Sequence, residues 1–437
     1  MSGRKKDQAE ILKKLGIEQL NQMQVEAHKA ISENDEIVLI SPTGTGKTIA
    51  FILPILNELD RHFKQIQVLI LVPSRELAIQ IEQVAKEMGS GYKINAVYGG
   101  KAGYKDKLDL KHPPHILIGT PGRIADHIRN QTISTEEIKT LILDEYDKSL
   151  ETGFEKEMKE IISILPPLDK MILTSATRKA TLPAFIKLKN PTYLTFENEK
   201  PNQLLIRTIT SPSHQKLRNL ERLLGYLGKG RGIIFCNLKE TLHLVDTFLN
   251  QQKISHSTFF GGMEQQDRER SLVKFRNQTH RILLATDLAA RGIDVPELDF
   301  IIHFELSFKK DEYLHRNGRT ARMHQNGVAY LMLRENEKLP GFVVNAQEVK
   351  LQPTNPAPQS LWETLYISGG RKDKISKGDI AGLFFKQAGL SKEELGVIEL
   401  KQDCAYVAIH RSKTKKVIQQ LNNSRLKKKK VRITKLK

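Results

Sequence analysis

One short stretch, SPTGTGKT at residues 41–48, has the residue types and spacing needed to bind a polyphosphate. Gly44 and Gly46 let the backbone curl so that successive N–H groups point at phosphate oxygens. Lys47 then reaches the terminal phosphates, and the hydroxyl of Thr48 is a suitable ligand for Mg²⁺. The usual pattern starts with glycine rather than serine, but a strand, this turn and a helix in succession outweigh the interpretation as a purely structural turn. The predicted nucleotide-binding residues are Ser41, Thr43, Gly44, Thr45, Gly46, Lys47 and Thr48.

A second polar stretch, DEYD at residues 144–147, comes at the end of the apolar run TLILD. Ligands of parallel α/β sheets collect at the carboxyl ends of the strands, so these acids would lie near the bound phosphates. We expect Asp144 to hold Mg²⁺ and Glu145 to orient and deprotonate the water that attacks the γ-phosphate. An isolated Asp-Glu pair is more often a solvent-facing turn, and it is the phosphate-binding stretch that favours the chemical interpretation. Tyr146 lies beyond both acids, so we expect metal binding and ATP hydrolysis to persist. Their coupling to the rest of the site would be altered.

These motifs need parallel strands to position them, and apolar runs of the sequence supply two series. The first series covers residues 36–40, 68–72, 115–119, 140–144 and 170–174, and the second covers 232–236, 281–286, 299–304 and 328–333. Because the runs alternate with amphipathic helical stretches, we predict parallel sheets covered on both faces, and hence two α/β domains. Beyond a Pro-rich stretch the expected elements follow the order βαββαβ, which fits a small split βαβ sheet. The predicted domains are residues 1–200, 201–350 and 362–437, with a hinge at 196–203 and a linker at 351–361.

Length and composition limit the class of protein. The chain has 437 residues, enough for two to four domains, and its 39% hydrophobic and 27% charged content fits folded soluble domains. No apolar run approaches the ~20 residues that span a bilayer, and the N-terminal stretch lacks the apolar segment of a secretory signal. Cys236 and Cys404 are far apart, which argues against a disulfide framework and suits a reducing cytoplasm.

The formal net charge of +19 is unevenly distributed. Residues 411–437 contain twelve Lys or Arg and no Asp or Glu. A polyanion is the natural partner of such a segment, since each neutralised phosphate releases counterions. A charge run alone is as often a solvated face, so this feature by itself leaves nucleic acid binding at even odds.

Seven further stretches make the chain resemble the DEAD-box RNA helicases over roughly residues 15–333. They are PSRELA (73–78), GG (99–100), TPGR (120–123), SAT (175–177), MEQQDR (263–268), ATDLAARGID (285–294) and HRNGRTAR (315–322). The resemblance implies two tandem RecA-like domains, with ATP bound between them and single-stranded RNA lying across both. It also implies that hydrolysis depends on closure of the two domains.

The same resemblance assigns roles to individual residues. Those implied in catalysis are Lys47, Asp144, Glu145, Ser175, Thr177, Arg319 and Arg322, and those implied near the ribose are Gly292 and Asp294. The two arginines would stabilise transition-state charge on the γ-phosphate. Those implied in gripping the RNA backbone without reading bases are Pro73, Arg75, Gly100, Thr120, Gly122, Arg123, Arg268 and Thr286. Taken singly, each is better interpreted as a helix cap or turn residue, and only the set favours RNA.

The chain departs from the family pattern where adenine is read. The matching stretch is GIEQLNQMQ, which keeps a glutamine, Gln24, but lacks the usual prolines and has no aromatic residue before Phe51. Adenine selectivity is therefore left open. Two smaller departures are Tyr146, where the family has alanine, and Ala321, where glycine is common.

The last 75 residues resemble the RNA-binding module of DbpA-like helicases, an RRM-type fold. The agreement lies in LYISGGRKDKI, GDIAGLF, GVIEL, YVAI and VRITKLK. In RRM folds aromatic side chains on the two middle strands stack bases, and Tyr366 and Tyr406 occupy those positions here. The alternative is binding by loops and basic edges, through residues such as Arg371, Lys372 and Lys428. Strand tyrosines are also common simply because they favour β-structure.

Together these features predict an ATP-dependent RNA helicase that uses ATP and Mg²⁺, separates short duplexes locally and acts as a cytoplasmic monomer. If the DbpA resemblance extends to targets, its substrate is a hairpin of the large ribosomal RNA and its process is ribosome assembly. One alternative is an ATP-gated RNA clamp or scaffold with little unwinding. Another is DNA unwinding, which the expected contacts to 2′-hydroxyls disfavour.

Overall fold

The structure is a computed structural model of the whole chain, which divides near residue 201 into two compact units. It describes all residues except 1–7, 43, 101–102, 177–181, 197–203, 287–294, 296–297, 321–326, 353–355 and 437, and the side chains of 103–105 and 107. The predicted hinge therefore lies almost wholly outside the described residues. None of the described helices combines the length and apolar character that a bilayer crossing requires.

The first unit is built on a seven-stranded parallel sheet with the strand order β3-β4-β2-β5-β6-β1-β7. Its strands are β1 (Glu36–Ile40), β2 (Val68–Leu71), β3 (Ile94–Val97), β4 (Ile116–Gly119), β5 (Thr140–Leu143), β6 (Lys170–Ser175) and β7 (Thr192–Thr195). The five strands at the centre are the five apolar runs of the first series, which confirms the predicted parallel sheet. β3 and β7 were not predicted, because their sequences INAV and TYLT, at the two sheet edges, mix polar and apolar residues.

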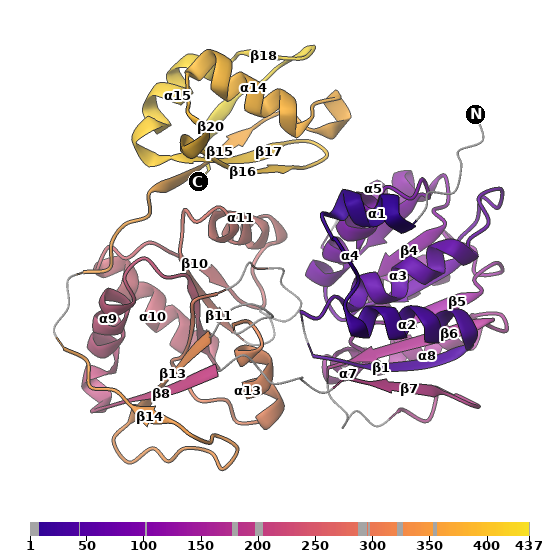
Figure 1. The fold of residues 1–437 in the computed structure, drawn as a ribbon, viewed down its shortest axis with the longest axis horizontal. Helices are drawn as coiled ribbons and strands as arrows, with labels where there is room; N and C mark the ends of the chain where they lie inside the picture. Colours follow the sequence, from indigo (N-terminus) through magenta and orange to yellow (C-terminus); the bar gives the residue numbers. More distant parts are fainter. Residues whose placement is uncertain are drawn as a thin grey trace. The chain divides into compact units, whose positions relative to one another are not determined.

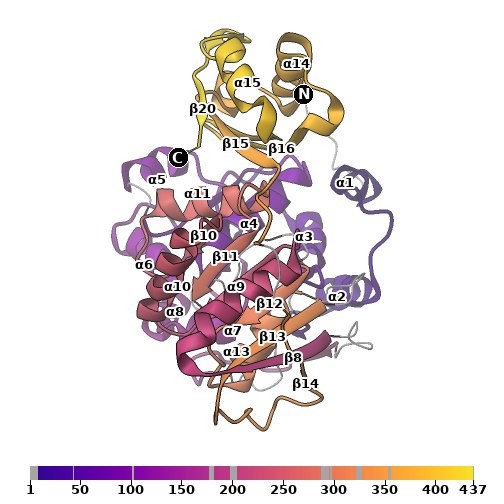
Figure 2. The same ribbon diagram turned by 90° about the vertical axis from the view of Figure 1, so that its left-hand side faces the viewer.

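Helices cover both faces of this sheet, as Figures 1 and 2 show. They are α1 (Gln8–Leu15), α2 (Gln22–Glu33), α3 (Lys47–Glu58), α4 (Arg75–Glu87), α5 (Gly103–Leu110), α6 (Pro121–Arg129), α7 (Tyr146–Glu151) and α8 (Glu155–Ile164). Apolar residues of α2, α3 and α4 form the core on one face, and those of α6, α7 and α8 form it on the other. The strands are buried on both sides, which explains their continuous apolar sequences.

The second unit contains a similar seven-stranded sheet of order β10-β11-β9-β12-β13-β8-β14, again parallel. Its strands are β8 (Leu204–Ser211), β9 (Gly232–Cys236), β10 (His256–Phe259), β11 (Ile282–Thr286), β12 (Phe300–His303), β13 (Gly327–Arg334) and β14 (Gln347–Glu348). Its helices are α9 (Lys216–Leu227), α10 (Lys239–Gln251), α11 (Gln265–Arg276) and α13 (Lys310–Asn317). Two RecA-like sheets in tandem confirm this part of the predicted fold.

The C-terminal region of the second unit is a smaller antiparallel sheet of order β16-β17-β15-β20. Its elements are β15 (Trp362–Ile367), α14 (Lys377–Ala388), β16 (Leu395–Leu400), β17 (Ala405–His410), α15 (Thr414–Leu421) and β20 (Ile433–Lys435), with a small hairpin of β18 (Arg425–Leu426) and β19 (Lys429–Lys430). Alternate residues such as Leu365 and Val407 face α14 and α15, so Tyr366 and Tyr406 lie on the opposite face. The order βαββαβ is as predicted, with the extra hairpin inserted before the last strand.

Candidate active site and RNA-binding residues

The phosphate loop joins β1 to α3, and its own groups hold it in shape. Gly46 has φ +87° and precedes Lys47, the first residue of α3. The Lys47 ammonium donates to the carbonyl oxygens of Ser41 and Pro42, and the Thr45 hydroxyl donates to the Pro42 carbonyl at 2.9 Å. Polyphosphate binding at this loop therefore requires Lys47 to exchange carbonyl oxygens for phosphate oxygens. Thr43 lies outside the described residues.

Gln24 contacts the phosphate loop directly. It is buried at 6% exposure in α2, its amide nitrogen donates to the Gly46 carbonyl at 3.3 Å, and its oxygen accepts from the Asn21 backbone. Asn21 caps α2 and also donates to the Thr45 carbonyl at 3.0 Å. A side chain at Gly46 would meet the Gln24 amide, with a Cβ only 2.4 Å away. Asn21 was not predicted, although an N-cap position before a helix with a matching glutamine three residues on is a recognisable signal.

The DEYD acids lie at the carboxyl end of β5, one strand away from the phosphate loop. β6 runs between β5 and β1, and its last residue, Ser175, is buried and accepts a hydrogen bond from the Ser41 backbone at 3.0 Å. Sheet topology thus brings Ser41, Ser175 and Asp144 to one edge, as the carboxyl-end rule predicts. Thr177 lies outside the described residues.

Asp144 is a buried carboxylate prepared for a cation. Only 3% of it is exposed, and its oxygen accepts a hydrogen bond from the Thr174 hydroxyl on β6. Burial, followed by the neighbouring charge of Glu145, raises the pKa of Asp144 to about 6, while the Thr174 bond and the Lys47 charge oppose this rise. A bound cation would favour the ionised form. Thr174 was not predicted, because an interior strand threonine gives no sequence signal of a second role.

The backbone at Glu145 adopts the left-handed conformation, with φ 48° and ψ 49°. Such conformations cost of order 1–3 kcal/mol in non-glycine residues and cluster at functional sites. Here the Glu145 N–H donates to the Thr174 hydroxyl at 3.1 Å, so one threonine holds both acids. Glu145 is the N-cap residue of α7, and its left-handed backbone makes the turn from the end of β5 into that helix.

Tyr146 faces the core rather than the phosphate loop. It is 2% exposed and packs among the apolar residues of α6, α8 and the sheet. Burial raises its pKa to about 12, so it is a neutral phenol. Asp147 follows it, and burial also raises the pKa of that carboxyl to about 6. The departure from alanine therefore changes the packing beneath the acids, and both acids keep their place at the strand end.

In the second unit, Arg319 follows α13 and is 7% exposed. Its neighbour Arg316 is fully buried and donates to the Glu305 carbonyl at 2.8 Å and to the Asn237 side chain at 2.6 Å. Arg316 thus anchors α13 to the ends of β9 and β12. Arg322, Gly292 and Asp294 lie outside the described residues, and their predicted roles stay predictions.

The RNA-binding residues predicted in the first unit come together at one sheet edge. Pro73 and Arg75 follow β2, Gly100 follows β3, and Thr120, Gly122 and Arg123 follow β4, and these three strands are neighbours in the order β3-β4-β2. Gly100 has φ +83°, and a Cβ there would lie 2.4 Å from the Arg75 guanidinium. The positive φ and the nearby guanidinium both favour glycine at this turn. Thr120 occupies the N-cap of α6, with Arg123 in its first turn.

The two candidates of the second sheet lie on neighbouring strands and helices. Thr286 ends β11 and is buried, and Arg268 on α11 lies over the ring of Phe259, 4.7 Å from its centroid. Phe259 ends β10, the strand beside β11. These contacts position Arg268 near the carboxyl ends of both strands.

The sheet-face tyrosines of the C-terminal region pack on each other and on α11. Tyr366 and Tyr406 are cross-strand partners with ring centroids 5.9 Å apart. Tyr406 is only 7% exposed because it clusters with Leu436 and with Val273 of α11. In this arrangement the face that would stack bases is occupied by an α-helix of the same chain. RNA binding by these tyrosines stays a prediction.

Polar bonds reinforce the contact between α11 and this sheet. Arg276 donates to both carboxylate oxygens of Glu399 at 2.8 and 2.9 Å. The hydroxyls of Thr279 and Thr364 are 2.7 Å apart and buried. The bidentate geometry and the burial indicate a specific contact rather than a chance approach of two surfaces. In Figures 1 and 2, α14 and α15 cover the other face of the sheet.

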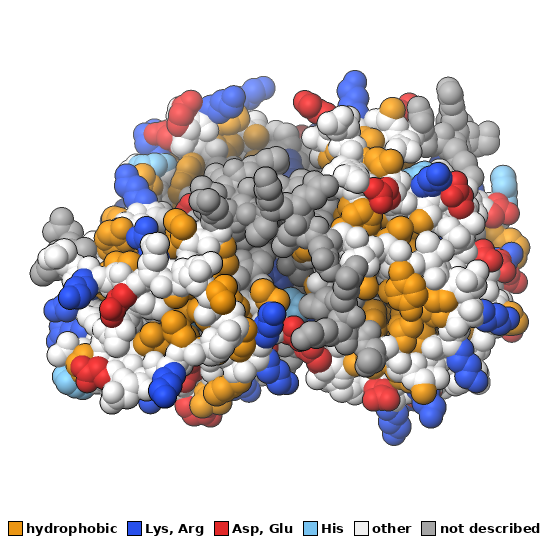
Figure 3. Space-filling model, turned by 60° about the horizontal axis from the view of Figure 1, so that its bottom comes forward, with side chains coloured by type: hydrophobic (Ala, Val, Ile, Leu, Met, Phe, Trp, Pro, Cys, Tyr) orange, Lys and Arg blue, Asp and Glu red, His pale blue; other side chains and the backbone are white. Residues whose placement is uncertain are grey.

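The loops and edges of the C-terminal region present basic residues to solvent. Arg371, Lys372 and Lys428 are exposed, and Lys372 pairs with Asp403 at 2.5 Å. Lys428 lies between β18 and β19, a hairpin in which Lys427 pairs with Asp379. By contrast, on the face of the molecule drawn in Figure 3 the basic side chains are scattered among acidic and apolar ones.

The chain is similar to known families along most of its length. The DEAD/DEAH box helicase family model matches residues 21–185, the helicase conserved C-terminal domain matches 215–324, and the DbpA RNA binding domain matches 364–435. The ATP-dependent RNA helicase DbpA of Escherichia coli (strain K12) is 32% identical, over 98% of this chain and 96% of the relative. DbpA of Bacillus subtilis (strain 168) is 30% identical, over 97% and 96%. Among solved structures, Saccharomyces cerevisiae Dbp5 bound to RNA and ADP BeF3 is similar with a TM-score of 0.68 and 25% identity, covering 78% of this chain and 93% of Dbp5.

Proposed function

The chain belongs to the DbpA-like DEAD-box ATP-dependent RNA helicases, and from that membership we propose that it hydrolyses ATP to separate short RNA duplexes locally. The enzyme class follows from the family, whereas the local mode of unwinding is our proposal. The observation that best supports ATP hydrolysis is that Lys47, Asp144 and Glu145 lie at the same edge of one sheet, after β1 and β5, with only β6 between these two strands.

The oxygen donors at this centre suit Mg²⁺. Asp144 is held in place by Thr174, and Thr48 is the second residue of the helix that begins at the phosphate loop. Mg²⁺ prefers carboxylate and hydroxyl oxygens together with phosphates and retained waters, so these two residues would hold it. When bound, it would neutralise charge on the β- and γ-phosphates. Glu145 would orient and deprotonate the attacking water, and Lys47 would bind the terminal phosphates.

We further propose that the C-terminal region directs the enzyme to one structured RNA, a hairpin of large-subunit ribosomal RNA, during ribosome assembly. Support comes from the match to the DbpA RNA binding domain at residues 364–435 and from the exposed basic hairpin around Lys428. With the sheet face occupied by α11, loops and basic edges are the surface offered to RNA. We also propose that the enzyme acts as a monomer in the cytoplasm, where its cysteines Cys236 and Cys404 stay free thiols.

A phosphate-release assay tests the proposal. We expect ATP hydrolysis by the full chain to be stimulated by RNA, not by DNA of the same sequence, and most strongly by RNA containing the ribosomal hairpin. Strand displacement should fall steeply as the duplex is lengthened. Truncation after Gln359 should keep stimulation by generic RNA and remove the hairpin preference. RNA binding with negligible turnover would instead identify an ATP-gated clamp.

A further inference from the structure

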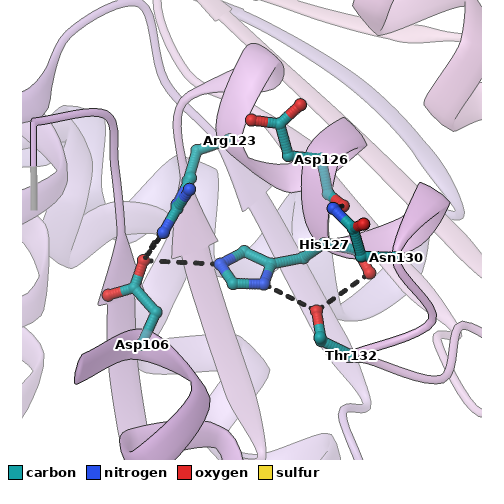
Figure 4. A network of polar contacts seen from close by, with 6 residues as sticks. All are labelled: Asp106, Arg123, Asp126, His127, Asn130 and Thr132. Carbon is teal, nitrogen blue, oxygen red and sulfur yellow. Dashed lines mark hydrogen bonds and ion pairs between the residues drawn. The ribbon is translucent and has the colours of Figure 1, made fainter. Parts of the chain in front are cut away.

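A buried carboxylate lies directly behind Arg123. Asp106, on α5, has no exposed side-chain surface, and its Oδ2 accepts from Nε and Nη2 of Arg123, each at 2.9 Å. Figure 4 shows the guanidinium turned edge-on to this oxygen. Arg123 itself keeps 19% of its side chain exposed, so it connects the buried acid to the surface.

A histidine one turn further along α6 approaches the same oxygen. His127 Nε2 lies 3.4 Å from Asp106 Oδ2, and its Nδ1 lies 2.7 Å from the Thr132 hydroxyl (Figure 4). Because a carboxylate only accepts hydrogen bonds, a hydrogen bond between these two atoms requires a proton on Nε2. Thr132 contacts both the ring and the His127 carbonyl, at 3.0 Å, and so fixes the ring orientation.

Filling this space with a buried carboxylate, an arginine and a histidine costs more free energy than filling it with apolar side chains. Burying a carboxylate costs free energy unless several hydrogen bonds satisfy it, and an apolar pair of similar volume often packs at no loss of stability. What an apolar pair would not provide is a fixed guanidinium. Asp106 engages the Nε edge of Arg123, which leaves the edge bearing Nη1 directed away from the acid. A planar fork fixed on one edge is preorganised for a phosphate oxygen on the other.

We propose that Asp106, supported by His127, is a positioning residue that fixes Arg123 for contact with an RNA backbone phosphate. The inference rests on the proposed function, in which Arg123 grips RNA beside Arg75 and Gly100. Asp106 does not touch RNA itself. It lowers the conformational entropy that Arg123 would otherwise lose on binding.

The test is a double-mutant cycle on RNA-stimulated ATP hydrolysis by the full chain, with a single-stranded homopolymer RNA as the probe. Asp106→Asn keeps the shape but removes the charge, and we expect it to raise the RNA concentration for half-maximal stimulation roughly tenfold, the usual effect of losing a charged hydrogen bond. Because Asp106 acts through Arg123, Asp106→Asn should have no further effect in an Arg123→Ala background. Multiplying effects in that background would overturn the proposal.

Asp126→Asn is the matched control. Asp126 lies on α6, the helix of Arg123 and His127, its side chain is 53% exposed, and Figure 4 shows it directed away from Asp106. It should leave the RNA dependence unchanged, and an effect as large as that of Asp106→Asn would contradict a specific role for Asp106. Thermal unfolding checks that each variant folds.

His127→Gln gives a second test should Asp106→Asn not fold. We expect a rise of about threefold in the RNA concentration, since one weaker bond to the same oxygen is lost, and again only when Arg123 is present. An unchanged RNA dependence would overturn the role of His127. If Arg123→Ala alone leaves the RNA dependence unchanged, the positioning role fails while the proposed function stands. A wild-type enzyme that RNA does not stimulate would refute the proposed function itself.

Discussion

The phosphate-loop edge of the first unit and the sheet face of the C-terminal region differ in how far local sequence predicts the surroundings of their residues. At the phosphate edge, Lys47, Asp144 and Glu145 follow from short local motifs, and the parallel sheet brings them together. On the C-terminal sheet, Tyr366 and Tyr406 occupy positions suited to base stacking, yet Val273 of another domain packs against them. The difference shows that motifs predict which residues lie together when they follow the strand ends of one sheet, and predict less when a distant surface packs on the same face.

The largest expected effect concerns the phosphate edge. Glu145→Gln should lower kcat for ATP about 10³-fold, because the amide cannot accept a proton from the attacking water, whereas the substitution keeps the size of the side chain. ATP and RNA binding should persist, since neither depends on that proton transfer. Single-turnover phosphate release together with RNA binding in the presence of ATP measures both. If the Glu145→Gln variant turned over ATP at the wild-type rate, Glu145 would have no role in the mechanism. The motif at the phosphate edge would then predict no more than the tyrosines of the C-terminal sheet.

The fold was predictable from sequence wherever strands are continuously apolar, as in EIVLI and VLILV. Edge strands such as INAV and HSTF were not predicted, because each mixes polar and apolar residues over only four positions, too few for a pattern to be recognised. At the site, motif residues were found, but Asn21, Thr174 and Asp106 were not. Thr174 contacts Asp144 and Asp106 contacts Arg123, and no local spacing encodes contacts between residues so far apart in the chain. Asn21 differs, because its N-cap position three residues before Gln24 is a local signal that could have been recognised.

Tyr406→Ala tests whether the C-terminal sheet face serves docking or base stacking. If Tyr406 mainly packs on α11 and Leu436, its loss should lower the free energy of unfolding by about 3 kcal/mol, as for other buried aromatics. Trp362 on β15 is the one tryptophan of the chain, so its fluorescence in urea reports on this region directly. A base-stacking tyrosine would instead lose about 1–3 kcal/mol of RNA affinity at nearly unchanged stability.

Tyr366→Ala is the control for that experiment. Tyr366 lies beside Tyr406 but is less buried, so it should cost less stability. Equal losses of RNA affinity in both variants would indicate that the sheet face opens to bind RNA.

His303 is another buried residue whose role was not predicted from the sequence. Burial, followed by the charge of Arg316, lowers its pKa to about 3, and it accepts from Arg316 while its Nε2 lies 2.9 Å from the Asn317 oxygen. The folded state therefore binds this proton less readily than the unfolded chain, whose histidine pKa is ~6.5. The contribution of neutral His303 to the free energy of unfolding is therefore complete above pH ~6.5 and is lost as the pH falls towards 3. About 2 kcal/mol of it is lost by pH 5.

His303→Gln should remove this part of the pH dependence, since glutamine does not titrate. Urea unfolding followed by circular dichroism at pH 7.5 and 5.0 measures the difference between wild type and variant. The same pH slope in both proteins would show that His303 is not held neutral.

The smallest effect expected concerns the ion pair between α11 and the C-terminal sheet. Arg276 and Glu399 are 23% and 16% exposed and bind in a bidentate manner, so a cycle of Arg276→Gln and Glu399→Gln should give a coupling free energy of about 1 kcal/mol. Trp362 fluorescence in urea is the readout, and the coupling should decrease with added salt. Lys372 and Asp403, 50% and 58% exposed, form the matched pair for which we expect almost no coupling. Equal coupling in the two pairs would mean that Arg276 and Glu399 interact only as surface charges. The sheet face would then be free to bind RNA through Tyr366 and Tyr406, as the sequence predicts.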